Sequence, residues 1–223
     1  MKLILMTLPT FFVEEHQILT ALFDEGLDIL HMRKPNTEPV YSERLLQLLP
    51  DNYRKQIVVH DHFYLKNEYG LKGIHLNQRN PELPAKYKGQ ISCSCLTEEE
   101  IKQRKKTFDY LFFSALYETK DGEHFTPRFT PAQIKSMSER KVIDKKVMAM
   151  GGIDLEHIPF LRDNGFGGIV LLGAIWNRFQ IHSTQDFREI ISHFRKIRKA
   201  TTKHNPPSNG ISKTYLKISP THE

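Results

Sequence analysis

Short apolar runs alternate along the chain with longer segments in which apolar residues recur every three or four positions. The first pattern is typical of β-strands, and the second is typical of amphipathic helices. The short runs predict strands at Lys2–Leu8, Asp28–Arg33, Gln56–Asp61, Gly73–Leu76, Gln90–Cys95, Asp109–Ala115, Lys146–Gly151 and Gly168–Gly173. The longer segments predict helices at Val13–Glu25, Tyr41–Leu49, Thr97–Lys105, Pro131–Arg140, Leu155–Asn164 and Thr184–Lys199.

This alternation predicts the fold. Eight strand–helix repeats within 223 residues fit a closed (β/α)8 barrel better than a doubly wound sheet, which normally has about five to seven strands. A G-x-G-x-x-G motif, the mark of a dinucleotide-binding sheet, does not follow the first strand. We therefore expect an α/β protein with a single domain, a (β/α)8 TIM barrel, over residues 1–200. Residues 201–223 are polar, rich in Pro and Ser and without periodicity, so we expect a flexible C-terminal tail.

The formal net charge of +6 raises the question of a nucleic-acid partner. Residues 184–223 carry eight Lys and Arg against three Asp and Glu, so the excess lies in the last helix and the tail. Because no nucleic-acid motif or aromatic platform accompanies it, we expect a solvated basic face and no nucleic-acid partner. An apolar run of the roughly 18 residues that a membrane helix needs is also missing. We expect a cytoplasmic protein with no membrane partner, and the sequence leaves open whether it forms a homo-oligomer.

The two cysteines, Cys93 and Cys95, lie two positions apart in a predicted strand and therefore share one of its faces. A zinc site would need further ligands at zinc-finger spacing, and the sequence does not offer them. We expect two reduced thiols in the core.

In a TIM barrel, functional side chains lie at the C-terminal ends of the strands. Gly151 and Gly152 end the seventh predicted strand, and Leu172 and Gly173 end the eighth. Loops in these two places commonly bind phosphate through backbone N–H groups, and a glycine lets the anion approach the backbone. The pair of loops predicts a phosphate site, whereas the alternative is that the glycines only shape tight turns.

Charged residues at other strand ends favour a larger anion. Arg33 and Lys34 follow the second strand and Lys120 follows the sixth, which is more positive charge than one phosphate needs and indicates a diphosphate or two phosphates. Asp61 is the only carboxylate at the ends of the second to fifth strands. A carboxylate facing a polyphosphate is typical of a Mg²⁺ ligand. The alternative is that Asp61 caps the helix that follows.

Four histidines, His31, His60, His62 and His75, come at the same end of the predicted barrel. Their spacing suits zinc, but histidines that line a polar pocket are commoner, and we favour that interpretation.

Six sequence motifs follow one another along the chain: HMRK at 31–34, VVHDH at 58–62, GIHLNQ at 73–78, DYLFFSALYETK at 109–120, VMAMGGI at 147–153 and GFGGIVLLGAI at 165–175. In this order they resemble the motifs of the thiamin-phosphate synthase/TenI family, and the resemblance covers nearly all of residues 1–200. The resemblance implies a synthase that joins hydroxymethylpyrimidine pyrophosphate to a thiazole phosphate with release of pyrophosphate. Such a reaction depends on stabilising the charge of the leaving group, and the family uses Mg²⁺ for it.

The resemblance also implies roles for single residues. Arg33, His31 and Lys120 would be catalytic, and Asp61 and Asn80 would hold Mg²⁺. The predicted substrate-binding residues are Lys34, His60, His75, Gln78, Ser94, Thr119, Gly151, Gly152, Leu172 and Gly173.

The chain departs from the synthase pattern at several of these positions. His31 replaces a Gln, Lys34 a Glu and Pro35 a Lys of the strand-two motif, and Asn80 replaces the second Mg²⁺ carboxylate, which predicts a weakened metal site. Two alternatives therefore stay open. One is a TenI-like thiazole tautomerase, favoured by His31 and the YET sequence at 117–119, although Ala115 stands where those enzymes have a histidine. The other is a non-catalytic binder of thiamin-precursor phosphates.

Overall fold

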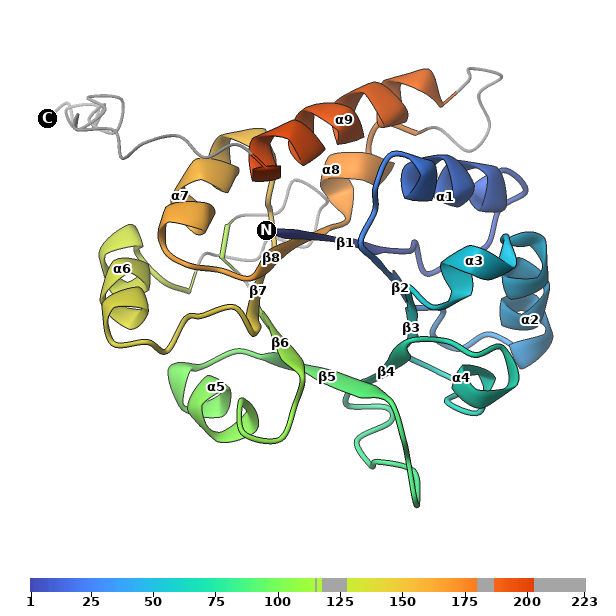
Figure 1. Cartoon of the computed structure of the whole chain (residues 1–223), viewed down its shortest axis with the longest axis horizontal. Coiled ribbons are helices and arrows are strands. Elements are labelled where there is room, and N and C mark those ends of the chain that lie inside the picture. Colours follow the sequence, from blue (N-terminus) through green and yellow to red (C-terminus); the bar gives the residue numbers. More distant parts are fainter. Residues whose placement is uncertain (115, 118–127, 180–186, 203–223) are drawn as a thin grey trace, which may run out of the picture.

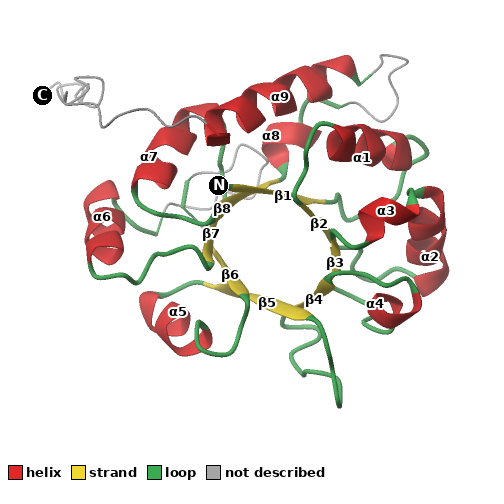
Figure 2. Ribbon diagram, viewed as in Figure 1, coloured by secondary structure: helices red, strands yellow, loops and turns green. Residues whose placement is uncertain are grey.

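Eight parallel strands close into a barrel in chain order, with β8 hydrogen-bonded to β1. The computed structural model describes residues 1–114, 116–117, 128–179 and 187–202. The strands form the inner ring and the helices the outer ring (Figures 1 and 2). The (β/α)8 prediction is thus confirmed, with strands β1 Lys2–Met6, β2 Ile29–Met32, β3 Ile57–Val59, β4 Gly73–Leu76, β5 Gln90–Cys95, β6 Tyr110–Phe113, β7 Val147–Met150 and β8 Gly168–Leu171.

Each predicted helix has a counterpart in the outer ring. These are α1 Glu15–Asp24, α2 Pro39–Leu48, α5 Glu98–Arg104, α6 Pro131–Glu139, α7 Ile158–Asp163 with the 3₁₀ turn η1 Leu155–His157 before it, and α9 Arg188–Thr202. Three one-turn helices were not expected from the sequence: α3 Asp51–Arg54, α4 Leu65–Glu68 and α8 Gly173–Trp176. A single turn is too short to show a periodicity of 3.6 residues. Among the described residues, helices long and apolar enough to cross a membrane are absent.

The last helix reaches further than the sequence indicated. Helix α9 continues through Thr202, and Thr201 is buried. The expected start of the tail at residue 201 therefore falls within a helix, and residues 203–223 lie outside the described part of the chain.

The outer ring lacks a helix between β4 and β5. Residues 77–89 contain neither helix nor strand, and they form a loop that projects from the ring (Figure 1). As a result, the residues after β4 can fold over the end of β3.

The core has two layers, as expected when strand side chains alternate between faces. Inward-facing residues such as Ile4, Val58 and Phe112 fill the barrel, and the larger cluster packs between strands and helices. Cys93 and Cys95 belong to the outer layer as buried free thiols, which confirms the prediction made for them.

Candidate active site

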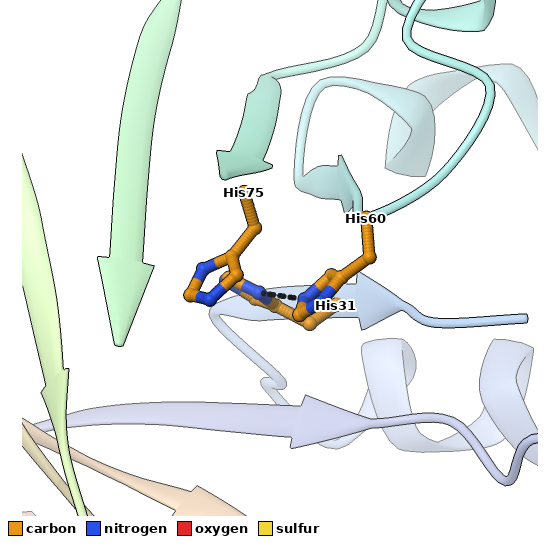
Figure 3. Close-up of side chains that lie close together, drawn as sticks. All are labelled: His31, His60 and His75. Carbon is orange, nitrogen blue, oxygen red and sulfur yellow. Dashed lines mark hydrogen bonds between the residues drawn. The ribbon is translucent and has the colours of Figure 1, made fainter. Parts of the chain in front are cut away.

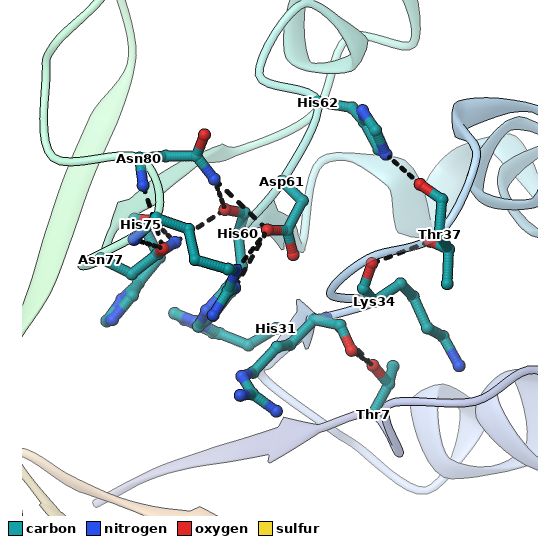
Figure 4. Close-up of polar contacts among 12 residues, drawn as sticks. Thr7, His31, Lys34, Thr37, His60, Asp61, His62, His75, Asn77 and Asn80 are labelled. Atoms are coloured by element: carbon teal, nitrogen blue, oxygen red, sulfur yellow. Dashed lines mark hydrogen bonds and ion pairs between the residues drawn. The ribbon is translucent and has the colours of Figure 1, made fainter.

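The ends of β1 and β2 are tied together through a single hydroxyl group. The Thr7 Oγ1 atom donates to the Arg33 carbonyl at 3.1 Å and accepts from the Arg33 N–H at 3.0 Å (Figure 4). Thr7 is buried, and sequence reasoning missed it because one threonine at a strand end is an ordinary residue. It fixes the backbone of Arg33, a predicted catalytic residue, at the mouth of the barrel.

Asp61 directly follows β3 and uses its two oxygens differently. The Oδ1 atom accepts from Arg79 Nε at 3.2 Å, from Arg79 Nη2 at 3.0 Å and from Asn80 Nδ2 at 3.3 Å. The Oδ2 atom is buried and has no hydrogen-bond partner among the described residues. A buried carboxylate oxygen without a partner is costly, so the position suits a cation.

The helix-capping alternative for Asp61 is wrong. Tyr64 occupies the N-cap position of helix α4, and its side chain makes no capping hydrogen bond.

Asn80 is placed as a hydrogen-bond donor, which corrects its prediction as a Mg²⁺ ligand. Its Nδ2 atom donates to the His60 carbonyl at 3.1 Å as well as to Asp61, and its oxygen points away from the carboxylate (Figure 4). The reason is that the His60 carbonyl accepts hydrogen bonds and therefore faces the nitrogen end of the amide.

Asn77 builds the loop that carries Arg79 and Asn80. Its Nδ2 atom donates to the His60 carbonyl at 2.7 Å, and its Oδ1 atom accepts from the backbone N–H groups of Arg79 and Asn80 at 3.0 and 3.2 Å. Sequence reasoning passed over Asn77, although an asparagine that precedes further polar residues after a strand is a recognised turn former.

Lys34 does not face the mouth, which corrects its prediction as a phosphate ligand. Its Nζ atom binds both carboxylate oxygens of Glu15 at 2.6 and 2.8 Å, donates to the Thr10 carbonyl at 2.7 Å and lies over the Phe11 ring. Both side chains of the pair are 1% exposed. Burial raises the pKa of Glu15 to about 7 even though the Lys34 charge pulls it down. The pair therefore anchors the residues after β2 to the start of α1.

His31, His60 and His75 form a buried cluster beneath the mouth (Figure 3). Their exposed fractions are 0, 3 and 1%. His31 Nδ1 lies 2.8 Å from His60 Nε2, and His31 Nε2 lies 2.7 Å from the Tyr110 hydroxyl. The prediction that these rings line a polar pocket is corrected, because residues facing into a barrel are covered by the layers around them. In this arrangement His31, predicted as catalytic, has no surface with which to touch a substrate.

Burial keeps all three rings uncharged. It lowers the pKa of His31 and of His60 well below the usual value and that of His75 to about 3. The Arg33 charge lowers the pKa of His60 and of His75 further.

His62 stands apart from the cluster. Its Nε2 atom contacts the Thr37 carbonyl at 2.9 Å (Figure 4).

Ser94 and Gln78 are exposed at the ends of β5 and β4. The Ser94 hydroxyl lies 3.2 Å from His75 Nε2, so it links the open end of the barrel to the buried histidines. Both residues stay predicted substrate contacts.

In the loop after β7, Gly151 and Gly152 adopt φ angles of 99° and 60°, a region that other residues rarely enter. This backbone is compatible both with the predicted phosphate site and with the alternative of a tight turn. Gly173 opens helix α8, which Trp176 fixes to the end of β1 by donating from Nε1 to the Met6 carbonyl at 2.8 Å. Leu172 is exposed beside them.

Thr119, Lys120 and Ala115 lie outside the described residues.

Comparison with known proteins decides the family. A sequence model described as thiamine monophosphate synthase matches residues 5–175. The chain belongs to the thiamine monophosphate synthase family. All predicted site residues, from His31 to Gly173, fall within the part of the chain that matches this family.

Individual relatives carry the same name. A thiamine-phosphate synthase from Staphylococcus epidermidis is 24% identical over 180 residues, which are 75% of this chain and 84% of that protein. One from Histophilus somni is 29% identical over 140 residues, 59% of this chain and 62% of that protein. A solved thiamine phosphate pyrophosphorylase from Bacteroides thetaiotaomicron is 50% identical, with a TM-score of 0.85, and the match covers 92% of this chain and 100% of that chain.

Proposed function

We propose that this protein is a thiamin-phosphate synthase, which joins hydroxymethylpyrimidine pyrophosphate to a thiazole phosphate and releases pyrophosphate. Beyond membership of the family, the observation that carries the proposal is the buried Asp61 Oδ2 atom, which has no partner among the described residues. Two arginines come from the same end of the barrel: Arg79 binds the other oxygen at 3.0 Å, and Arg33 directly follows the neighbouring strand β2. This combination suits a metal-bound diphosphate.

The reaction has two parts: the departure of pyrophosphate and the attack of the thiazole nitrogen. The bond between the pyrimidine methylene carbon and the pyrophosphate oxygen breaks, and its electron pair leaves with pyrophosphate. The thiazole nitrogen then supplies the electron pair for the new carbon–nitrogen bond. Because the barrier lies in separating charge, the protein contributes mainly positive charge and positioning.

Separate groups of residues would serve the departing pyrophosphate and the attacking thiazole. Arg33 and Arg79 stabilise the departing pyrophosphate, and Lys120 is proposed to join them from the loop after β6. Asp61 would hold Mg²⁺ through Oδ2, and the ion would neutralise charge on the diphosphate. Gly151, Gly152, Leu172 and Gly173 are proposed to bind the phosphate of the thiazole through their backbone. Thr119, Ser94 and Gln78 are proposed to contact the substrates from neighbouring strand ends.

The tautomerase alternative is less well supported. It needs an acid–base group that can reach its substrate, and His31 is fully buried. A cytoplasmic location is part of the synthase proposal, and the oligomeric state stays open.

The test is a product assay. Purified protein is mixed with hydroxymethylpyrimidine pyrophosphate, thiazole phosphate and Mg²⁺, and thiamin phosphate is measured as fluorescent thiochrome. We expect product that disappears when EDTA removes the metal. If the thiazole phosphate binds but product does not form, the synthase proposal is wrong, and turnover of a carboxythiazole phosphate tautomer would then separate a tautomerase from a non-catalytic binder.

A further inference from the structure

The proposed reaction does not use the histidine cluster, which consists of His31, His60 and His75. The proposed reaction assigns charge stabilisation to arginines and to Asp61, and it gives no role to three rings buried under them. Ligand atoms of the three side chains all lie within 4.8 Å of one another, and the closest pair, His31 Nδ1 and His60 Nε2, is 2.8 Å apart (Figure 3).

The fold itself brings the three rings together. His31 lies in β2, His60 follows β3 and His75 lies in β4, three neighbouring strands whose side chains share the interior of the barrel. Because parallel strands are held in fixed register, the cluster is a property of the rigid scaffold and not of a loop.

Hydroxyl groups contact the ring nitrogens of His31 and His75. Tyr110 contacts His31 Nε2 at 2.7 Å, which leaves Nδ1 facing the other rings. Ser92 and Ser94 lie at 2.9 and 3.2 Å from the two nitrogens of His75, so one of these serines keeps the ring oriented while the other contact would break for a metal. Metal-binding histidines characteristically donate their second ring N–H to an oxygen, which fixes the orientation of the ring.

The protonation state also suits a metal. Burial keeps the rings neutral, and only neutral imidazole offers a lone pair to a metal ion. In the described part of the chain these rings hydrogen-bond to hydroxyl groups and to one another and not to carboxylates, so stabilisation of a protonated histidine does not explain the cluster.

We propose that His31, His60 and His75 bind a divalent transition-metal ion of the zinc type, at a site separate from the Mg²⁺ position at Asp61. Three imidazoles at the usual zinc–nitrogen distance of about 2.1 Å in tetrahedral geometry hold their nitrogens roughly 3.4 Å apart. The observed separations, from 2.8 Å to at most 4.8 Å, lie on both sides of this value. Metal binding therefore requires that the rings rotate, above all His60 and His75, which are now stacked with centroids 4.2 Å apart. It also requires that His75 release one serine hydroxyl and that the contact between His31 and His60 open.

Neighbouring charges set the selectivity of the site. Arg33 and Arg79 lie close enough to lower the pKa of His60, and they repel any cation. A hard ion such as Mg²⁺, which prefers oxygen, gains too little from imidazole to overcome this repulsion, whereas Zn²⁺ and Co²⁺ form strong bonds to nitrogen. The site therefore selects borderline transition metals. The proposal does not rest on the synthase activity, because metal binding is measured without substrates.

The experiment uses untagged full-length protein, freed of metal by a chelator and titrated with Co²⁺ in the presence of excess Mg²⁺. We expect one Co²⁺ per chain, with the strong visible absorption bands of four-coordinate cobalt, and displacement of the cobalt by Zn²⁺. His31→Gln keeps a polar side chain of similar size and should weaken Co²⁺ binding at least about 100-fold, since it removes a ligand. His16→Gln, in helix α1 on the other side of the barrel wall, is the matched control and should bind as the wild type does.

Two outcomes would overturn the proposal: wild-type protein that shows no four-coordinate cobalt bands, and a folded His31→Gln variant that binds Co²⁺ unchanged. Circular dichroism establishes whether the variant folds. If it does not fold, X-ray absorption on the zinc-loaded wild type decides the matter. Three imidazole ligands support the site, and fewer than three contradict it.

Discussion

At the residue scale, the chemistry at the mouth of the barrel depends on which hydrogen-bond partner each polar atom has. Asp61 offers one oxygen to Arg79 and Asn80 and keeps the other without a partner among the described residues. The position of Asp61 and of the glycines at strand ends could be predicted from the sequence, because apolar runs mark where the strands end, and their roles stay proposals. The orientation of Asn80 could not, because the carbonyl of His60, twenty residues earlier, determines it.

The first prediction concerns Asn80, which stands where the synthase pattern has a second carboxylate. Asn80→Asp places a second carboxylate beside Asp61, so we expect affinity for Mg²⁺ or Mn²⁺ to rise about tenfold, since ligand charge sets cation affinity. Mn²⁺ binding followed by electron paramagnetic resonance measures it. Asn67→Asp, which adds the same charge to an exposed position on α4, is the control. Equal affinity in both variants would mean that the position of Asp61 is not a metal site.

The second residue-scale prediction concerns the loop after β7. Gly152 and Gly70 have nearly the same φ angle, 60° and 62°. Valine at either position should destabilise the protein by about 1–3 kcal/mol, because a β-branched residue is strained there. Only Gly152→Val should also abolish binding of thiazole phosphate, measured by titration calorimetry. Retained binding in a folded Gly152→Val variant would show that the phosphate lies elsewhere.

At the element scale, regular strands were predictable and tertiary partners were not. All eight strands are visible in the sequence as apolar runs, whereas the one-turn helices α3, α4 and α8 are too short to show a period. Lys34 looked like a phosphate ligand because it adjoins Arg33. Its partner Glu15 lies nineteen residues earlier, and only the packing of α1 against the β2 end brings the two together.

This ion pair gives the element-scale prediction. Lys34→Met leaves the Glu15 carboxylate buried without its counter-charge and should cost about 3–5 kcal/mol in the free energy of unfolding. The double variant Lys34→Met/Glu15→Leu replaces both charges by apolar groups and should recover most of that loss. Urea unfolding measures the wild type, the single variants Lys34→Met and Glu15→Leu, and the double variant. A double variant whose loss is the sum of the two single losses would show that the pair is not coupled.

At the scale of the whole molecule, helix α9 joins the end of the described chain to its beginning. Arg198 Nη1 binds Asp28 Oδ2 at 2.7 Å, Arg195 pairs with Glu25, and the N-terminal ammonium donates to the Thr201 carbonyl at 3.3 Å. Ile190, Phe194 and Ile197 bury the other face of the helix in the core. The positive charge near the C-terminus, which suggested a solvated face in the sequence, thus partly pairs with acidic residues at the ends of α1 and β2.

The whole-molecule prediction compares two truncations. Removal of residues 203–223 should change the free energy of unfolding by less than about 0.5 kcal/mol, because the removed segment is polar and has no apolar periodicity. Removal of residues 188–223 also deletes α9 and should prevent stable folding. Thermal unfolding followed by circular dichroism distinguishes the two. A large loss on the shorter truncation would show that the tail is part of the folded domain.

The most direct test of the account is the stoichiometry of the reaction, followed by ³¹P nuclear magnetic resonance in one sample. With hydroxymethylpyrimidine pyrophosphate, thiazole phosphate and Mg²⁺, the wild-type protein should release pyrophosphate and form thiamin phosphate in equal amounts. Asp61→Asn should slow both at least about 100-fold, because it removes the carboxylate that would hold the metal. Pyrophosphate released without thiamin phosphate, or an Asp61→Asn variant as fast as the wild type, would contradict the proposed synthase site.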